Sequence, residues 1–274
     1  MDNLELLSDI KNILGEGPYY KDGIISWVDI LGKKLYIFDG KIKEVSFEEK
    51  ISAAIPLKNS GYLVCGENYL FLYKNDEIIK YMKIEHLMKN GMRCNDAKVD
   101  SMGRLWFSTI HDDNSSIYEG ALYCLDNGII KHINDTKLGN GMAWNKRDDK
   151  FYFSDTEDKK IYIYDYDKLT GEVSNKKVLC DIDGYPDGMT IDDNDNLFIA
   201  IWDGKRIEVR SGIDGKLIDK INMPTRLITS ATFAGANLDE LIITTASLNE
   251  KDEYAGKVFR LKTKYRGRKE YFYD

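Results

Sequence analysis

Cysteine, histidine and proline are scarce in this chain, and each shortage argues against a class of structure or site. The 274 residues include 4 prolines, so the composition does not indicate disorder. The 4 cysteines form no Cys-x-x-Cys pair, and their spacing suggests no zinc site of the usual kind. The 3 histidines are dispersed, which gives little support to a His-based metal site or a Ser-His-Asp triad.

The chain also lacks long apolar runs and an excess of positive charge. No apolar run approaches the roughly 18 residues that span a membrane. Residues 1–5 lack the basic region and apolar core of a signal peptide. The formal net charge of -7 argues against nucleic acid or an anionic membrane as a partner. We therefore expect a cytoplasmic protein with free thiols, most of them buried.

Aromatic residues are abundant, and they cluster with β-branched residues in short runs. The chain has 18 tyrosines, 10 phenylalanines and 4 tryptophans, a composition that favours strands. Strand-like runs recur at intervals of roughly 40–46 residues, the spacing of propeller blades with four strands. The strongest runs are residues 24–29, 62–65, 104–108, 150–154, 197–202 and 240–246. The sequence predicts one all-β domain over residues 1–274, a six-bladed β-propeller.

Some features of this architecture stay open at the level of the sequence. A two-sheet sandwich is the structural alternative, but it does not explain the repeat period. Helical periodicity is poor, and residues 80–90 alone could hold a short helix. Either residues 4–8 or residues 270–273 could supply the strand that joins the last blade to the first. We expect a monomer, the default for a closed propeller.

One polar position recurs in phase with the strands. It is occupied by Asn95, Asn140, Asp187 and, in a fourth repeat, Glu16. The position opens the first strand of each unit, which lines the central tunnel of a propeller, so these side chains should face one end of the tunnel. Oxygen ligands that converge from separate repeats are what a hard divalent cation needs. The repeat therefore predicts a metal site at one end of the tunnel.

Several short motifs add to this repeat. They are Gly-Glu-Gly-Pro at 15–18, Arg-Cys-Asn-Asp at 93–96, Gly-Asn-Gly-Met at 139–142, Tyr-Pro-Asp-Gly at 185–188 and Trp-Asp-Gly at 202–204. In their order and spacing, they resemble the gluconolactonase and regucalcin (senescence marker protein) family of six-bladed propellers. The resemblance runs from about Leu14 to the last blade.

The resemblance implies a site and an activity. It implies one divalent ion held by Glu16, Asn140 and Asp187, and a substrate contacted by Arg93 and Asn95. It implies a lactonase that opens a sugar lactone, such as a gluconolactone, to the open-chain acid. An all-oxygen ligand set suits Ca²⁺, Mg²⁺ or Mn²⁺, and Zn²⁺ is possible because carboxylates also bind it.

Roles within this site follow from the chemistry of the side chains. We expect Asp187 to act as the general base on water, with Asp96 and Asp155 as alternatives. Arg93 would donate hydrogen bonds to substrate from the rigid, planar set of N–H groups of its guanidinium. Asn95 would orient substrate or an outer-shell water.

Two other functions remain open. One is a metal-dependent hydrolase of other lactones, esters or organophosphates, and the other is a non-enzymatic calcium-binding propeller. The polar segment 111–118 is either a cover over the pocket or an ordinary surface loop.

Overall fold

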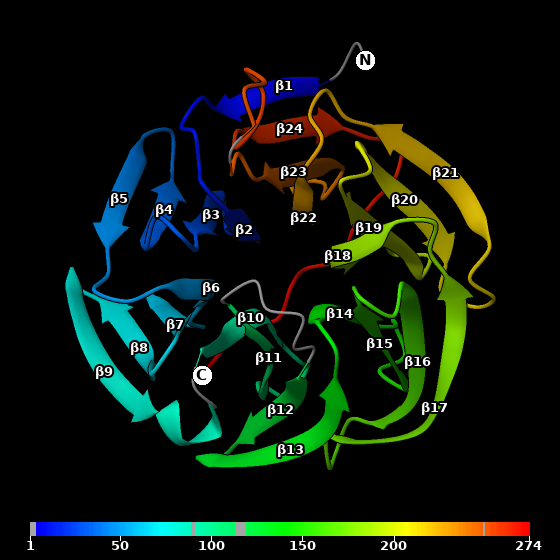
Figure 1. Ribbon diagram of the computed structural model, residues 1–274, viewed down its shortest axis with the longest axis horizontal. Helices are drawn as coiled ribbons and strands as arrows, with labels where there is room; N and C mark the ends of the chain where they lie inside the picture. Colours follow the sequence, from blue (N-terminus) through cyan, green and yellow to red (C-terminus); the bar gives the residue numbers. More distant parts are fainter. Residues whose placement is uncertain (1–3, 89–90, 113–118, 249) are drawn as a thin grey trace.

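Six antiparallel sheets of four strands surround a central axis (Figure 1). This arrangement is seen in a computed structural model that describes residues 4–88, 91–112, 119–248 and 250–274. It confirms the predicted all-β, six-bladed propeller. The first strand of each blade lies nearest the axis, and the following strands lie progressively outward.

Blades 1 to 5 each consist of four consecutive strands. Blade 1 contains β2 (Gly15–Lys21), β3 (Ile24–Asp29), β4 (Lys34–Phe38) and β5 (Ile42–Ser46). Blade 2 contains β6 (Ile51–Pro56), β7 (Tyr62–Gly66), β8 (Tyr69–Lys74) and β9 (Glu77–Lys83). Blade 3 contains β10 (Met92–Val99), β11 (Leu105–His111), β12 (Gly120–Asp126) and β13 (Ile129–Thr136). Blade 4 contains β14 (Gly139–Trp144), β15 (Lys150–Asp155), β16 (Lys160–Asp167) and β17 (Glu172–Asp181). Blade 5 contains β18 (Tyr185–Ile191), β19 (Asn196–Trp202), β20 (Arg206–Ser211) and β21 (Leu217–Asn222).

Blade 6 is assembled from two distant parts of the chain. Its inner strands are β22 (Ile228–Ala234), β23 (Glu240–Thr245) and β24 (Val258–Lys262). Its outermost strand is β1 (Leu4–Ser8), which pairs antiparallel with β24. Of the two candidate closing segments, residues 4–8 therefore take this role and residues 270–273 do not.

Residues 263–274 instead form a segment across the propeller, which we call the C-terminal strap (Figure 1). The Gly267 N–H donates to the carbonyl of Leu238 in blade 6 at 2.7 Å, and Gly267 also forms a bridge with Asp192 in blade 5. Near the end of the strap, Tyr273 forms a parallel bridge with Leu57 in blade 2. The strap thus connects blades that are far apart in the sequence.

Glu270 fastens the strap to the inner strands of three blades. Its Oε1 accepts hydrogen bonds from Lys98 Nζ at 3.0 Å, Thr190 Oγ1 at 3.2 Å and Thr232 Oγ1 at 3.3 Å. Lys98 and Thr190 each follow the recurring polar position by three residues, a span of about 10 Å along a strand. The strap therefore crosses at the other end of the inner strands from the recurring polar position.

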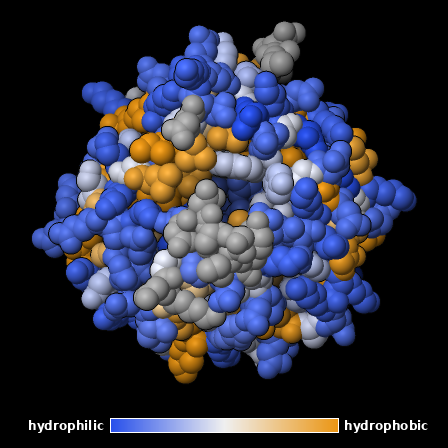
Figure 2. Space-filling view, in the orientation of Figure 1, coloured by the Kyte–Doolittle hydropathy of each residue, from blue (hydrophilic) through white to orange (hydrophobic). Residues whose placement is uncertain are grey.

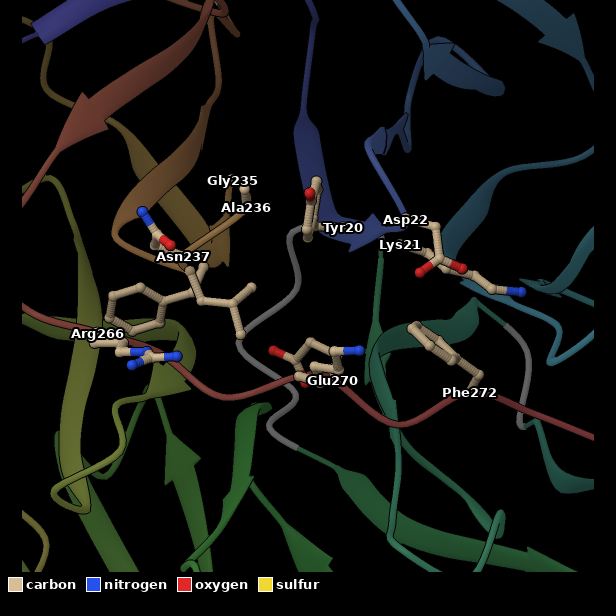
Figure 3. A pocket seen from close by; sticks show the side chains of 12 residues that line it. Tyr20, Lys21, Asp22, Gly235, Ala236, Asn237, Arg266, Glu270 and Phe272 are labelled. Atoms are coloured by element: carbon tan, nitrogen blue, oxygen red, sulfur yellow. The ribbon is translucent and has the colours of Figure 1, made fainter.

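A cavity of about 300 Å³ lies beside the strap, between blades 1 and 6 (Figure 3). Tyr20 and Lys21 border it from blade 1, and Glu270 and Phe272 border it from the strap. None of the five residues predicted for the functional site lines this cavity.

Of the segment 80–90, which the sequence suggested could hold a short helix, the described residues 80–88 form no α-helix, and residues 89 and 90 lie outside the described residues. Strand β9 continues to Lys83 as the outermost strand of blade 2, and a 3-10 turn follows at Glu85–Leu87. Nearly all of β9 is exposed, so the strand lacks the alternation of buried and exposed residues that would have identified it. Across the described ranges, no helix is long and apolar enough to cross a membrane.

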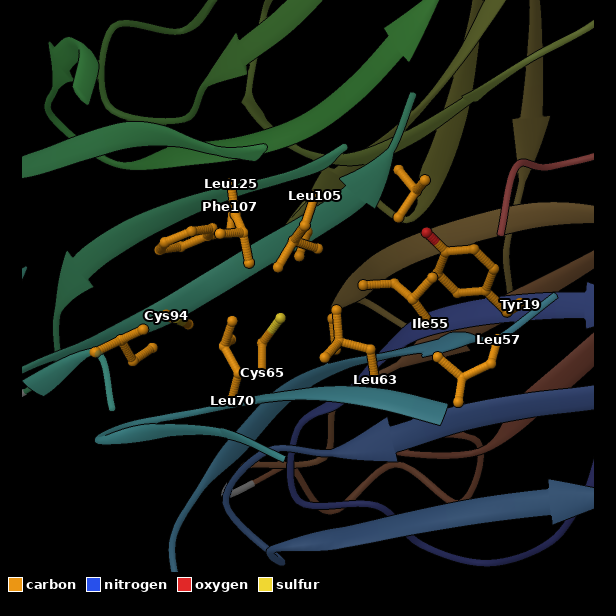
Figure 4. Packing of buried hydrophobic residues seen from close by; sticks show 14 residues of the cluster. Tyr19, Ile55, Leu57, Leu63, Cys65, Leu70, Cys94, Leu105, Phe107 and Leu125 are labelled. Carbon is orange, nitrogen blue, oxygen red and sulfur yellow. The ribbon is translucent and has the colours of Figure 1, made fainter. Parts of the chain in front are cut away.

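Apolar side chains fill the spaces between neighbouring blades. Figure 4 shows one such cluster, in which Leu63 and Cys65 of blade 2 pack near Cys94, Leu105 and Phe107 of blade 3. These five residues are completely buried. All four cysteines are free and three of them are buried, as expected from the composition.

Buried hydroxyl groups add polar contacts across the same interfaces. Ser108 of β11 donates to the carbonyl of Gly139 in the next blade at 2.8 Å. Ser154 holds the equivalent place in β15, and it donates to the carbonyl of Asp187 in the next blade at 2.9 Å. Both serine side chains are fully buried, so each bond satisfies a carbonyl that water does not reach.

Substitution of Ser154 by alanine tests this contact. The change leaves the buried Asp187 carbonyl without its hydroxyl donor, so the free energy of unfolding should fall by about 1–3 kcal/mol in urea denaturation. Ser174→Ala, on the exposed outer strand β17, is the matched control and should change it by less than about 0.5 kcal/mol. Equal effects of the two substitutions would contradict a stabilising role for the Ser154 hydroxyl.

Candidate active site

A β-bulge interrupts each inner strand near its start. The register shifts fall between Glu16 and Tyr19, Ile51 and Ala53, Cys94 and Ala97, Gly139 and Met142, Pro186 and Met189, and Ile228 and Ser230. At a bulge, one strand places extra residues opposite fewer residues of the partner strand. The side chains at the bulge therefore point in directions that a regular strand does not give them. The recurring polar position lies in or beside these bulges. Local backbone structure therefore sets the direction of each side chain.

The five predicted site residues all lie on inner strands, at the same end. Glu16 lies on β2, Arg93 and Asn95 on β10, Asn140 on β14, and Asp187 on β18. All except Asn95 are buried, with at most 8% of the residue exposed. Figure 2 shows a hollow near the centre of one face of the propeller, with both hydrophilic and hydrophobic side chains beside it.

The carboxyl groups of this cluster interact with one another. Burial raises the pKa of Glu16 well above its ordinary value, and the charges of Asp187 and Asp96 raise it further. Burial likewise raises the pKa of Asp187, followed by the charge of Asp96. A hydrogen bond from the Asn140 side chain opposes this shift. Glu16, Asp96 and Asp187 therefore belong to one electrostatic cluster, although they come from three blades.

Asp96 stands beside the predicted ligands, on the same bulge as Asn95. Its Oδ1 accepts a hydrogen bond from the Ala97 N–H at 2.7 Å. Burial is the main cause that raises the pKa of Asp96 to about 6, while Lys98 lowers it. General-base catalysis is most efficient when the pKa of the base lies near the operating pH, so this shift suits Asp96 to the role.

Arg93 is held in one orientation by its neighbours. Its Nε donates to Asp112 Oδ1 at 2.6 Å, and its Nη1 donates to Asn95 Oδ1 and to the Cys94 carbonyl, each at 2.9 Å. Asn95 in turn donates from Nδ2 to the Gly139 carbonyl at 2.9 Å. The arginine and the asparagine predicted to contact substrate are thus in direct contact.

Asn140 is fixed through its amide nitrogen. Nδ2 donates to Thr156 Oγ1 at 3.2 Å, and the Thr156 hydroxyl donates to the Pro186 carbonyl at 2.7 Å. This use of the nitrogen leaves the amide oxygen to accept from a ligand or bind a cation.

Asp155, one of the alternative bases, is engaged elsewhere. Its carboxylate accepts backbone N–H groups of Lys137 at 2.8 Å and Leu138 at 3.1 Å, just before β14. Asp29 makes the same contacts in blade 1, with the N–H groups of Ile13 and Leu14. Asp155 therefore fastens the segment that leads into an inner strand.

The described residues fit a hard cation by the chemistry of their donors. Glu16, Asp96 and Asp187 form no ion pair within the described chain. Burial is the main cause of their raised pKa values, and neighbouring carboxylate charge adds to it. A divalent cation would offset this negative charge. Within the same residues, no three His, Cys, Asp or Glu side chains are grouped as a metal site. An ion here would therefore use two carboxylates together with the Asn140 amide oxygen.

Other residues of this region were not anticipated from the sequence. Ser52 and Thr229 occupy the bulges of blades 2 and 6, and their phase in the repeat could have identified them. Asp112 follows β11 and contacts Arg93, and no motif marks it. Residues 113–118 of the suggested cover lie outside the described residues.

Comparisons with known proteins agree with the fold and the motifs. Residues 14–247 match the family described as the SMP-30/Gluconolactonase/LRE-like region. The chain belongs to this family. A Bacillus subtilis (strain 168) protein named "Putative sugar lactone lactonase YvrE" is 32% identical over 262 residues, which cover 91% of this chain and 89% of that protein.

Two further members of the family extend the likeness. The pentonolactonase of Haloferax volcanii is 30% identical over 283 residues, which cover 95% of this chain and 94% of that protein. The structure of a luciferin-regenerating enzyme is 28% identical, with a TM-score of 0.92 over 99% of each chain. The family is therefore shared over nearly the full length of the chain.

The raised pKa of Glu16 predicts how the stability of the metal-free protein varies with pH. A carboxyl whose pKa is higher in the folded than in the unfolded chain contributes stability below about pH 4. That contribution is lost as the pH rises through the folded pKa. Glu16→Gln removes the effect, so its melting temperature relative to wild type should increase between about pH 4 and about pH 8.

Thermal unfolding of chelator-treated protein measures this difference. Glu172→Gln, on the exposed part of β17, is the matched control and should show a difference that stays nearly constant with pH. A constant difference for Glu16→Gln as well would contradict the electrostatic account of the cluster.

Proposed function

We propose that the protein is a divalent-metal-dependent lactonase that hydrolyses a sugar lactone to the open-chain sugar acid. The observation that carries this proposal is the cluster of three buried carboxyl groups beside a fixed arginine. Two of the relatives above are named for a sugar lactone and a pentonolactone, which supports the substrate class.

Glu16, Asn140 and Asp187 would hold the ion through oxygen atoms, from blades 1, 4 and 5. Their chemistry suits Ca²⁺, Mg²⁺ or Mn²⁺, and also Zn²⁺ through its carboxylate ligands. When bound, the ion would offset negative charge that develops on the lactone oxygen and would lower the pKa of a water molecule.

Arg93 and Asn95 would orient the lactone at the mouth of the tunnel. Arg93 is buried and already fixed by hydrogen bonds, so it loses little side-chain freedom when it donates to substrate oxygen atoms. This pre-organisation lowers the entropic cost of holding the carbonyl carbon near the attacking water.

Asp187 would accept the proton of the attacking water. The water oxygen forms a bond with the carbonyl carbon, and the bond from that carbon to the ring oxygen then breaks. The ring oxygen takes up the proton and becomes a hydroxyl group, while the carbonyl carbon ends as a carboxylic acid. Asp96, whose pKa is about 6, is the alternative acceptor in the same cluster.

Proton release on addition of D-glucono-1,5-lactone tests this function. The protein is first treated with chelator, and Ca²⁺, Mg²⁺, Mn²⁺ or Zn²⁺ is then restored singly, with metal-only blanks. Acid production that returns with an ion is expected, and the comparison ranks the ions. Five-carbon lactones, other esters and phosphoesters form the second panel. Metal binding with no turnover on any substrate would instead favour a calcium-binding propeller.

Substitution of Asp187 by asparagine should reduce kcat by at least about 10²-fold at saturating metal, because the proton acceptor and a charged metal ligand are lost while the shape is kept. Asp181→Asn, on the exposed outer strand β17, is the control and should retain wild-type turnover. Full turnover in Asp187→Asn with loss of turnover in Asp96→Asn would assign the base to Asp96.

A further inference from the structure

Arg93 belongs to a chain of ion pairs that extends outward from the candidate site. Its Nε lies 2.6 Å from Asp112 Oδ1, and the other oxygen of Asp112 pairs with Lys50. Lys50 also lies 3.5 Å from Glu67 Oε1. Exposure of the side chains rises along this chain, from 7% at Arg93 to 15% at Asp112 and 29% at Lys50. The least exposed member is the one that faces the site.

The backbone fixes Asp112 at this place. Asp112 directly follows β11, and its N–H donates to the carbonyl of Gly91, just before β10, at 2.8 Å. Lys50 comes from blade 2, immediately before β6. The carboxylate is therefore held between two cations from neighbouring blades. Burial raises the pKa of Asp112, but Arg93 and Lys50 lower it by more, which keeps the group ionised.

The contacts of Arg93 account for only part of its guanidinium group. Nε and Nη1 are used by Asp112, Asn95 and the Cys94 carbonyl. Nη2 makes no hydrogen bond within the described residues, and it carries two N–H donors. The guanidinium group is planar, so the hydrogen bond from Nε to Asp112 also sets the orientation of the Nη2 donors. Asp112 can do this without any contact with substrate.

We propose that Asp112 is a positioning residue that turns the Nη2 edge of Arg93, which makes no hydrogen bond within the described residues, toward the lactone, with Lys50 holding Asp112 in place. The inference rests on the function proposed above, and it adds a statement about specificity. The two N–H donors of Nη2 diverge in the guanidinium plane, so they can reach two separate substrate oxygen atoms, such as the carbonyl and a hydroxyl further round the ring. Asp112 therefore favours hydroxylated lactones over unsubstituted ones.

The repeat supplies a matched control for Asp112. Asp112 follows Ser108 by four residues, and Asp158 follows the equivalent Ser154 by four residues. Asp158 also forms an ion pair at a blade edge, with Lys137 at 2.6 Å, and its side chain is 21% exposed. Loss of its charge removes an ion pair at the same place in the repeat that does not involve Arg93, although its partner Lys137 is more exposed, at 55%.

Steady-state kinetics of the metal-loaded protein test the proposal. Asp112→Asn should raise KM for a hydroxylated sugar lactone by about tenfold and change kcat by less, because a contact used in binding is misaligned. Asp158→Asn should leave both constants unchanged. Asp112→Glu keeps the charge and should recover part of the loss. Asp112→Asn leaves the buried Arg93 charge without its carboxylate and should lower the melting temperature more than Asp158→Asn. The kinetic comparison is therefore made at a temperature at which circular dichroism shows both variants fully folded.

A double-substitution cycle shows whether Asp112 acts through Arg93. On an Arg93→Gln background, Asp112→Asn should add little further loss, since the group that it positions is gone. Additive losses, or equal behaviour of Asp112→Asn and Asp158→Asn, would overturn the inference. A wild-type protein that turns over no lactone with any ion would instead overturn the proposed function itself.

Discussion

The β-bulge repeated in all six inner strands is the constraint on which the rest of the molecule depends. A bulge turns a side chain away from the regular alternation and leaves backbone groups unpaired by the ladder. In blade 5 the bulge carries the Asp187 side chain, and the carbonyl of Asp187 accepts the Ser154 hydroxyl of blade 4. The same distortion therefore shapes the candidate site and joins adjacent blades.

The electrostatics of the candidate site suit a neutral substrate and a charged product. Burial and mutual repulsion raise the pKa values of Glu16 and Asp187, while the charge of Arg93 is largely taken up by Asp112. In the proposed reaction a lactone brings no charge, and the acid that forms ionises at neutral pH. A divalent cation held by Glu16 and Asp187 would offset the charge of these carboxylates and would attract the anionic product more strongly than the neutral lactone.

The repeat in the sequence predicted the fold and the grouping of Glu16, Asn140 and Asp187. In a propeller, residues at the same position of different repeats lie at the same end of the inner strands and therefore near one another. The repeat could not identify Asp112, since the contact with Arg93 depends on how β11 ends.

The sequence also could not choose between the two chain ends for blade closure. Both candidate segments are short and similarly apolar. Which of them closes the propeller depends on the pairing of β1 with β24, a contact between distant parts of the chain. The exposed outer strand β9 was misread for a related reason, because a strand without a buried face has no periodic signal.

The pairing of β1 with β24 also constrains the order in which the molecule is built. Strand β1 pairs with β24, so blade 6 closes only after residues 258–262 have been synthesised. Contacts of such large sequence separation form slowly, because loop-closure entropy must be overcome first. Until closure, β1 and the open side of β2 remain without their neighbours. A nascent chain would therefore carry its apolar inter-blade surface exposed, and depend on chaperones or rapid completion to avoid aggregation.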